Sequence, residues 1–244
     1  MAEFIPSTTT ETEILRLVDD GLLQSQELVQ WRPATGEPTP TPRPCEVVLF
    51  KKFVQRGLTL PACDFLRGLL FFCGIELVNL NPNSILLIAI FVHFCEAFLG
   101  IPPHAGFFKY LFYIRPYPGA AQRHVLRGAN LQARLGHHFL NIPFKSSLKG
   151  WHSEWFYCAN HPPSLASFLG LSPNPAVSWK AEPGSAEAPN IVKLVREVDA
   201  LQDLGLTGIG VAANWLTPCC SSKAASPSGL GVLGSLRSDS GSGK

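Results

Sequence analysis

The sequence predicts an α+β fold that is mainly helical, with a helical core, a small antiparallel sheet and a disordered tail. Apolar residues recur at helical spacing in three runs between residues 61 and 114, and Asn, Gly or Pro bounds these runs. Residues 124–159 are instead rich in aromatic and branched side chains, in short runs typical of strands. Residues 219–244 are rich in Ser and Gly, a composition typical of disorder.

Composition sets broad limits on the kind of protein. With 244 residues, of which 46% are hydrophobic, the chain is long enough to bury a core in one or two domains, and it is not disordered throughout. Only 16% of the residues are charged, against roughly 25% in an average globular protein. The deficit indicates a surface partly covered by a partner or by another part of a longer protein, or simply a chain rich in Ser, Pro and Gly.

The N-terminal part, residues 1–31, predicts a small helical arm. Thr10 or Thr12 is suited to cap a helix that ends at Gly21. Three apolar residues should share the inner face of this helix: Ile14, Leu15 and Val18. A second short helix is expected close to Trp31.

Five prolines lie within residues 32–44, which therefore cannot form a helix or a central strand. We interpret this segment as an extended linker between the arm and a main domain, residues 45–218, which the tail of residues 219–244 follows.

The main domain begins with residues 45–57, where strand and helix patterns compete. A helix with Pro61 in its first turn and Gly74 at its end follows, and its apolar positions are Phe65, Leu66, Leu69, Leu70 and Phe72. The central helix should run from Asn81, a suitable N-cap, to Leu99. A third helix is expected over residues 105–114.

The second half of the main domain predicts strands first and helices later. We expect short antiparallel strands within residues 124–136, 137–144 and 154–159. Residues 189–204 return to helical spacing, with Ile191, Leu194, Val195, Val198 and Leu201 on one face. One more short helix is expected over residues 208–218.

The order of several motifs resembles one protein family. These motifs are "RGLTLP", "LNPNSI", "FCEAFLGIPPH", "SEWFY" and "LQDLGLTGIGVAANWL". Over about residues 10–217 the chain is similar to the plant gypsy-type transposon, or transposase-like, domain family. The resemblance implies a retrotransposon-derived protein from a transposable element, and it carries no catalytic residue over to this chain. The early end of the sequence, compared with longer members, suggests a truncated copy.

The stretch "GWHSEWFYCANH", residues 150–161, has two interpretations. His152, Cys158 and His161 are possible zinc ligands, but a structural zinc site needs four ligands and no second ligand pair accompanies them. We therefore expect no metal and no cofactor here, and interpret the aromatic residues as a plug on one side of a strand. The predicted core residues are Phe65, Leu69, Phe91, Glu96, Trp151, Trp155 and Tyr157.

Residues of the central helix offer a weak catalytic pattern. His93 and Cys95 lie two apart and point about 200° away from each other on a helix, which argues against a nucleophile pair. Glu96 can meet His93 and should form a buried polar pair with it. No set of three acidic residues suggests a Mg²⁺ site, and we predict that the protein is not an enzyme.

Basic residues gather where acidic residues are absent. The acid-free segment 97–153 contains Arg115, Arg123, Arg127, Arg134, Lys145 and Lys149, which predict a nucleic-acid-binding surface or a solvated face that pairs with acids elsewhere.

The preferred hypothesis is therefore a non-enzymatic assembly or interaction module that associates with itself or with a protein partner. A nucleic-acid-binding module is the alternative. The apolar stretch 84–101 is interrupted by His93 and Glu96, so we expect no membrane span. The absence of a signal peptide and the irregular spacing of seven cysteines favour an intracellular protein, in the nucleus or the cytoplasm.

Overall fold

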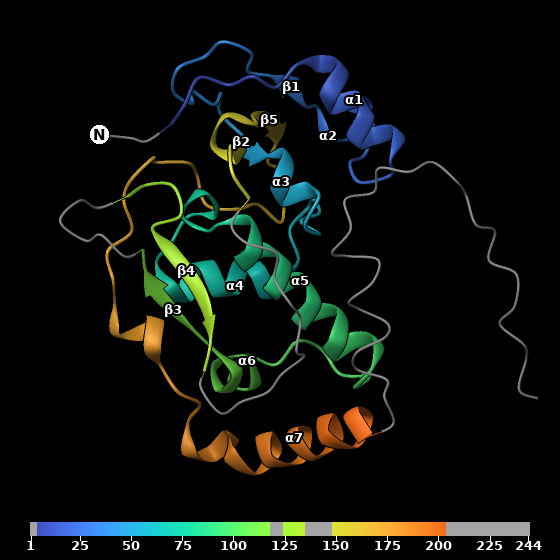
Figure 1. The fold of residues 1–244 in the computed structure, drawn as a ribbon, viewed down its shortest axis with the longest axis vertical. Coiled ribbons are helices and arrows are strands. Elements are labelled where there is room, and N and C mark those ends of the chain that lie inside the picture. Colours follow the sequence, from blue (N-terminus) through green and yellow to red (C-terminus); the bar gives the residue numbers. More distant parts are fainter. Residues whose placement is uncertain (1–3, 118–123, 135–147, 204–244) are drawn as a thin grey trace, which may run out of the picture.

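The computed structural model describes residues 4–117, 124–134 and 148–203, and this part of the chain folds into helices and two small antiparallel sheets (Figure 1). The predicted α+β, mainly helical class is confirmed. The sequence predicted one small sheet, whereas the strands form two, because strands far apart in the chain pair with different partners. The predicted strand over residues 137–144, the helix over 208–218 and the tail lie outside the described residues.

The three-stranded sheet has the order β1-β5-β2, and all its neighbours are antiparallel. Its strands are β1 (Arg32–Pro33), β2 (Glu46–Phe50) and β5 (Trp155–Ala159). The central strand β5 is buried along its whole length. Pro33 lies in an edge strand, where a missing N–H is tolerated because no further strand needs it.

The N-terminal segment packs over this sheet (Figure 1). Helix α1 (Glu11–Asp19) is capped by Thr10, one of the two caps that the sequence suggested, and Thr10 and Glu13 form a capping box in which each side chain accepts the other's backbone N–H. Its inner face was predicted wrongly in one position: Leu15 is 44% exposed, whereas Leu17 is buried beside Ile14. Ile14 and Leu17 are three residues apart and therefore lie on the same face of the helix, whereas Leu15 lies outside this face. Helix α2 (Gln26–Val29) is a single turn.

Hydrogen bonds attach the residues before α1 to the central strand. The indole Nε1 of Trp155 donates to the carbonyl oxygen of Ile5 at 2.9 Å, and the hydroxyl of Ser7 donates to the carbonyl of Trp155 at 2.5 Å. The proline-rich segment reaches the same strand, since the N–H of Thr41 donates to the Tyr157 hydroxyl at 2.8 Å. The four-segment division of the chain stays a prediction.

The ambiguous residues 45–57 form both structures in succession. Strand β2 is followed at once by α3 (Lys51–Val54), with Phe50 as its N-cap residue. Competition between the two patterns thus reflected a strand-to-helix junction within one short apolar run.

Helices α4 (Asp64–Cys73) and α5 (Pro82–Ala97) lie at the centre of the described part of the molecule (Figure 1). Helix α4 ends at Gly74, whose φ of +62° is left-handed, as expected for a glycine C-cap. Its start is later than predicted, because Cys63 is the N-cap residue and Pro61 precedes the helix. Helix α5 begins as predicted at Asn81, whose side chain accepts the N–H of Ser84 at 2.8 Å. No helix among the described residues is long and apolar enough to cross a membrane.

The predicted third helix is shorter than the sequence suggested. Helix α6 (Ala105–Leu111) gives way to β3 (Phe112–Pro116), which pairs with β4 (Ala129–Ala133). Within β3, burial alternates between Phe112 and Ile114 on the inside and their neighbours outside, a strand period that continues directly from the helix.

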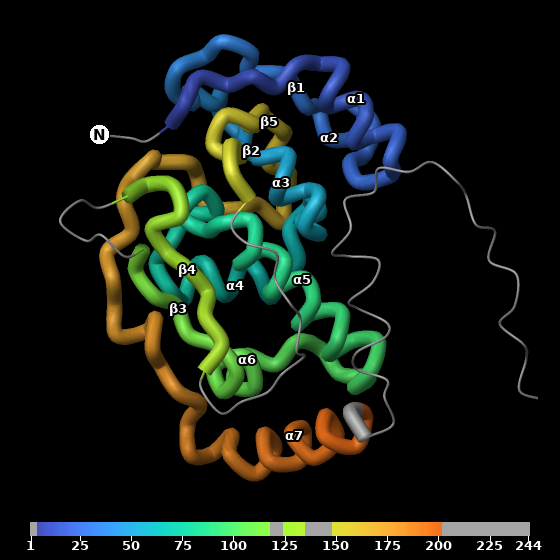
Figure 2. The backbone as a smooth tube through the Cα atoms, in the orientation of Figure 1, coloured from blue at the N-terminus to red at the C-terminus, as the bar shows by residue number. Residues whose placement is uncertain are grey.

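The last described segment runs along the outside of the molecule (Figure 2). It contains the 3₁₀ turn η3 (Val177–Lys180) and helix α7 (Ala188–Asp203), which packs against α6. Ile191, Leu194 and Val198 are buried on the inner face of α7, as the helical spacing predicted. Further 3₁₀ turns are η1 (Leu77–Asn79), η2 (Trp151–Ser153) and η4 (Ser185–Glu187).

Candidate functional site

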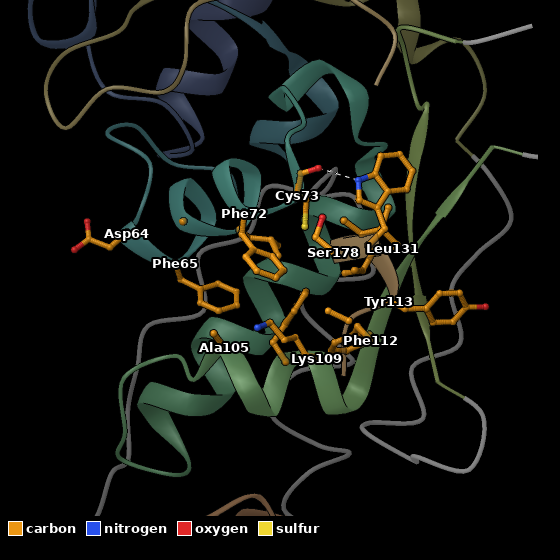
Figure 3. A pocket seen from close by; sticks show the side chains of 16 residues that line it. Asp64, Phe65, Phe72, Cys73, Ala105, Lys109, Phe112, Tyr113, Leu131 and Ser178 are labelled. Atoms are coloured by element: carbon orange, nitrogen blue, oxygen red, sulfur yellow. Dashed lines mark hydrogen bonds between the residues drawn. The ribbon is translucent and has the colours of Figure 1, made fainter. Parts of the chain in front are cut away.

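A cavity of about 250 Å³ opens between α4, α6, the β3–β4 pair and η3 (Figure 3). Its lining is predominantly apolar and comes from segments far apart in the sequence. The lining residues that matter most are Phe65, Leu69, Phe72, Phe108, Leu131 and Trp179.

Aromatic contacts fix the inner wall of this cavity. The rings of Phe65 and Phe108 lie 5.2 Å apart in an edge-to-face arrangement, and that of Phe112 lies 5.0 Å from Phe108. Phe91 of α5 lies behind them, 5.1 Å from Phe108. Since Phe65 is on α4 and Phe108 on α6, these contacts hold the two helices at the separation that leaves the cavity.

Turn η3 closes one side of the cavity. The indole Nε1 of Trp179 donates a hydrogen bond to the carbonyl oxygen of Cys73 at 2.8 Å (Figure 3). Because Cys73 is the last residue of α4, its carbonyl has no partner within the helix, and Trp179 satisfies it. Burial raises the pKa of the Cys73 thiol to about 11 although Lys109 opposes the shift, so this thiol is protonated at neutral pH.

Lys109 supplies the positive charge at the cavity. Its Nζ lies 4.3 Å from the centroid of the Phe72 ring. Among the described residues, no carboxylate lies within ion-pair distance of this ammonium group. Asp64 also lines the cavity, but its side chain is 93% exposed, is paired with Arg67 and points away (Figure 3).

A second cavity, of about 280 Å³, lies beside α5 and contains Cys63, His93 and Glu96 in its wall. Glu96 is exposed, so its assignment to the core was wrong. It lies on the solvent side of the last turn of α5, next to exposed Ala97, while Phe94 and Cys95 face the core. Because Glu96 is exposed, it does not form the predicted buried pair with His93. Burial raises the pKa of the Cys95 thiol to about 11.

The structure separates the three residues considered for zinc. Cys158 is fully buried in β5, where desolvation raises the pKa of its thiol, whereas His161 is exposed after the strand. His152 lies in η2 and stacks on Trp151 at 4.2 Å. Within the described ranges, no group of three His, Cys, Asp or Glu side chains could hold a metal ion.

The other predicted core residues have different surroundings. Phe91, Trp151, Trp155 and Tyr157 are buried, with Trp151 in η2 and not on the strand. Its ring packs 4.8 Å from that of Phe50. Two further members of the set, Phe65 and Leu69, are half-buried because they face the cavity.

The predicted nucleic-acid-binding residues differ in exposure and in their contacts in the part of the chain that is described. Arg115 on β3 and Lys149 are exposed. Arg127 is half-buried, with its guanidinium 4.2 Å above the ring of Tyr117. Arg134 donates to the carbonyl oxygens of Lys109, Lys180 and Ala181 at 2.7, 3.1 and 3.0 Å. Two further members of the set, Arg123 and Lys145, lie outside the described residues.

Comparison with known proteins finds one similarity, over the segment that contains α4, α5 and α6. Residues 47–116 match the model of a family described as "Putative gypsy type transposon". Residues 47–116 are therefore similar to the gypsy-type transposon family. The match runs from β2 to the end of β3, so the gypsy-type segment contributes α4, α6 and Lys109 to the cavity.

The match confirms the predicted resemblance for less than half of the chain. The resemblance of the flanking residues and the plant origin stay predictions. No curated protein and no solved structure matches the chain. The similarity to the gypsy-type family thus covers residues 47–116, and it does not by itself specify an activity.

Sequence reasoning missed the apolar cavity and the place of Lys109 in it. A single cation within the apolar run "AGFFKYLF" was the available signal, because a charge there must lie at an edge of the core. The sequence did not reveal that Phe72 and Trp179 approach the same space.

Proposed function

We propose that the protein is a non-catalytic, retrotransposon-derived assembly module that associates with a second copy of itself. The contact uses a surface that we call the α4 apolar surface, formed by Phe71, Leu169, Leu171 and Val177. Exposure of large apolar side chains on this surface is the observation that carries the proposal, since Phe71 is 90% and Val177 is 93% exposed. Such side chains gain the most from burial against a partner.

Hydrogen bonds bring the segments of this surface together. The carboxylate of Glu76 accepts the N–H of Leu169 at 3.1 Å, and the side-chain amide of Asn79 donates to the carbonyl of Leu171 at 3.1 Å. The Trp179–Cys73 bond holds η3, and therefore Val177, against the end of α4. The segments that carry these exposed side chains are thus attached to residues 73–79, next to Phe71.

Charge favours an identical partner. Residues 68–75 and 155–179, which supply the α4 apolar surface, contain no Asp, Glu, Lys or Arg. Two copies can therefore approach through this surface without bringing like charges together, and a strongly charged partner would find no complement. The low charged fraction of the whole chain, 16%, agrees with a surface that is covered in the assembled state.

Three buried thiols are poorly suited to nucleophilic catalysis. Cys73, Cys95 and Cys158 are buried, and desolvation raises the pKa of each thiol, which disfavours the reactive thiolate. The similarity of residues 47–116 to a gypsy-type family supports derivation from a transposable element, and the assembly role rests on the exposed apolar side chains and their uncharged surroundings.

Nucleic-acid binding remains the alternative function. Exposed Arg115 and Lys149 are available for phosphate contacts. Against it, Arg134 is held by three backbone carbonyls and Arg127 by the ring of Tyr117, so both would have to leave existing contacts.

Self-association can be measured by light scattering coupled to size-exclusion chromatography over a series of protein concentrations. We expect a concentration-dependent dimer, and we expect Phe71→Ser with Val177→Ser to weaken it at least about tenfold, as central apolar contacts do. Leu28→Ser on α2 is the matched control, because Leu28 is 64% exposed but lies away from this surface. A chain that stays monomeric at every concentration, or a dimer that both variants weaken equally, would overturn the proposal.

A further inference from the structure

We infer that the cavity between α4, α6 and η3 binds a small amphipathic carboxylate, with its apolar body among the aromatic rings and its carboxylate at Lys109. This inference goes beyond the proposed assembly role. The cavity lining and the α4 apolar surface have no residue in common, so one can fail while the other holds.

The cavity favours an apolar body of limited size. Phe65, Leu69, Phe108 and Leu131 line it from three different elements, and Trp179 adds an indole face. Its volume of about 250 Å³ is below the roughly 300–1,000 Å³ of pockets that hold drug-sized ligands. One aromatic ring or a short aliphatic chain therefore suits it better than a larger molecule.

The charge at the cavity favours an anion. Lys109 is half-buried, and its ammonium group is stabilised on one side by the ring of Phe72. A partly desolvated ammonium gains further from a carboxylate, and in the described chain no acidic side chain supplies one. Asp64, the only acid in the lining, already pairs with Arg67 and is directed outward (Figure 3).

The apolar lining and the charge of Lys109 together should select ligands by the charge of their head group. An anionic head group complements Lys109, a neutral head group loses that attraction, and a cationic head group is repelled. The hydroxyl of Ser178 is also in the lining and can donate a hydrogen bond to a carboxylate oxygen.

Three probes of equal size differ in the charge of the head group: 3-phenylpropionate is anionic, 3-phenylpropan-1-ol is neutral and 3-phenylpropylamine is cationic. Binding to the full chain is measured by NMR titration of the methyl signals of Leu69, Ile114 and Leu131, which line the cavity. We expect the carboxylate to bind about fivefold more tightly than the alcohol, and the amine to bind most weakly.

Variants of Lys109 test whether the preference for the carboxylate over the alcohol depends on the charge of this side chain. Lys109→Met keeps an unbranched apolar stem, so we expect the carboxylate to fall to the affinity of the alcohol while the alcohol is unaffected. Lys109→Arg should retain the preference for the carboxylate. Equal binding of carboxylate and alcohol to the unmodified chain would overturn the inference even if a variant failed to fold, and so would the absence of shifts at the cavity methyl groups. Self-association is recorded in parallel, and an intact dimer with no carboxylate preference rejects this inference alone.

Discussion

The phenol of Tyr157 donates a hydrogen bond to the carboxylate of Glu37 at 2.5 Å, joining the central strand β5 to the proline-rich segment. The same hydroxyl accepts the N–H of Thr41 at 2.8 Å, and the guanidinium of Arg32 lies 3.8 Å from the centroid of its ring. Burial, reinforced by the hydrogen bond with Glu37, raises the pKa of this phenol. One side chain therefore organises three residues of the segment that the sequence suggested was a linker.

Replacing Tyr157 by Phe should lower the free energy of unfolding by about 1–3 kcal/mol, because the Thr41 N–H and the Glu37 carboxylate lose a buried partner. Urea denaturation followed by circular dichroism measures the change. Tyr113→Phe is the control: Tyr113 is half-buried on β3, its hydroxyl makes no hydrogen bond within the described residues, and the change should stay within about 0.5 kcal/mol. Equal effects of the two substitutions would contradict this role of Tyr157.

Trp155→Ala should destabilise the protein by about 3–5 kcal/mol, the range for removal of a large aromatic side chain from a core. Trp155 is fully buried, and its ring contacts that of Tyr157 edge-to-face at 5.7 Å. Trp155→Phe retains a ring and loses the Nε1 hydrogen bond to Ile5, so a smaller loss of about 1–2 kcal/mol is expected. A melting temperature that neither substitution changes would reject the interpretation of this stretch as an aromatic plug.

Local signals in the sequence predicted local structure well. Thr10, Asn81 and Gly74 each marked a helix end that the structure contains, because caps depend on residues within one turn. Errors arose where burial comes from distant contacts: the inner face of α1 and the early end of α6 depend on what packs against them.

Long-range pairing could not be predicted from these patterns. Strand β5 was expected, but its position between β1 and β2 depends on a register that joins Tyr157 to Val48 and to Arg32. The cavity was missed for the same reason, since Phe72, Lys109 and Trp179 become neighbours only when α4, α6 and η3 pack together. Glu96 was assigned to the core from its apolar neighbours, although the last turn of α5 has a side open to solvent.

His152 should make the protein less stable in mild acid. Burial, and then the positive charge of Arg127, lower the pKa of its imidazole to about 4, against roughly 6.5 in an unfolded chain. Because the folded-state pKa is the lower one, the contribution to stability is complete above about pH 6.5 and is lost as the pH falls towards 4.

We expect the unmodified protein to lose about 1–2 kcal/mol of unfolding free energy between about pH 7 and 5 that His152→Gln does not lose, allowing for partial solvent screening. Urea denaturation at both pH values measures this difference. Glu13 and Glu46 also have lowered pKa values, since hydrogen bonds from Lys51 and Arg32 outweigh the opposing effect of burial, but their contributions are lost only below about pH 4.3. Exposed His161 is the control, and a His161→Gln variant with the same altered pH dependence would show that His152 is not the responsible group.

Loss of the charge should destabilise the protein at Arg134 but not at Arg115. Arg134→Met removes the donor to the carbonyl oxygens of Lys109, Lys180 and Ala181, so we expect a loss of about 1–3 kcal/mol in urea denaturation. Arg115 is exposed on β3, and Arg115→Met should change stability by no more than about 0.5 kcal/mol.

Fluorescence anisotropy with a labelled DNA or RNA oligonucleotide tests whether Arg115 contacts nucleic acid. If Arg115→Met instead reduced a strongly salt-dependent affinity while leaving stability intact, the exposed cation would be a phosphate contact and the nucleic-acid alternative would replace the assembly role.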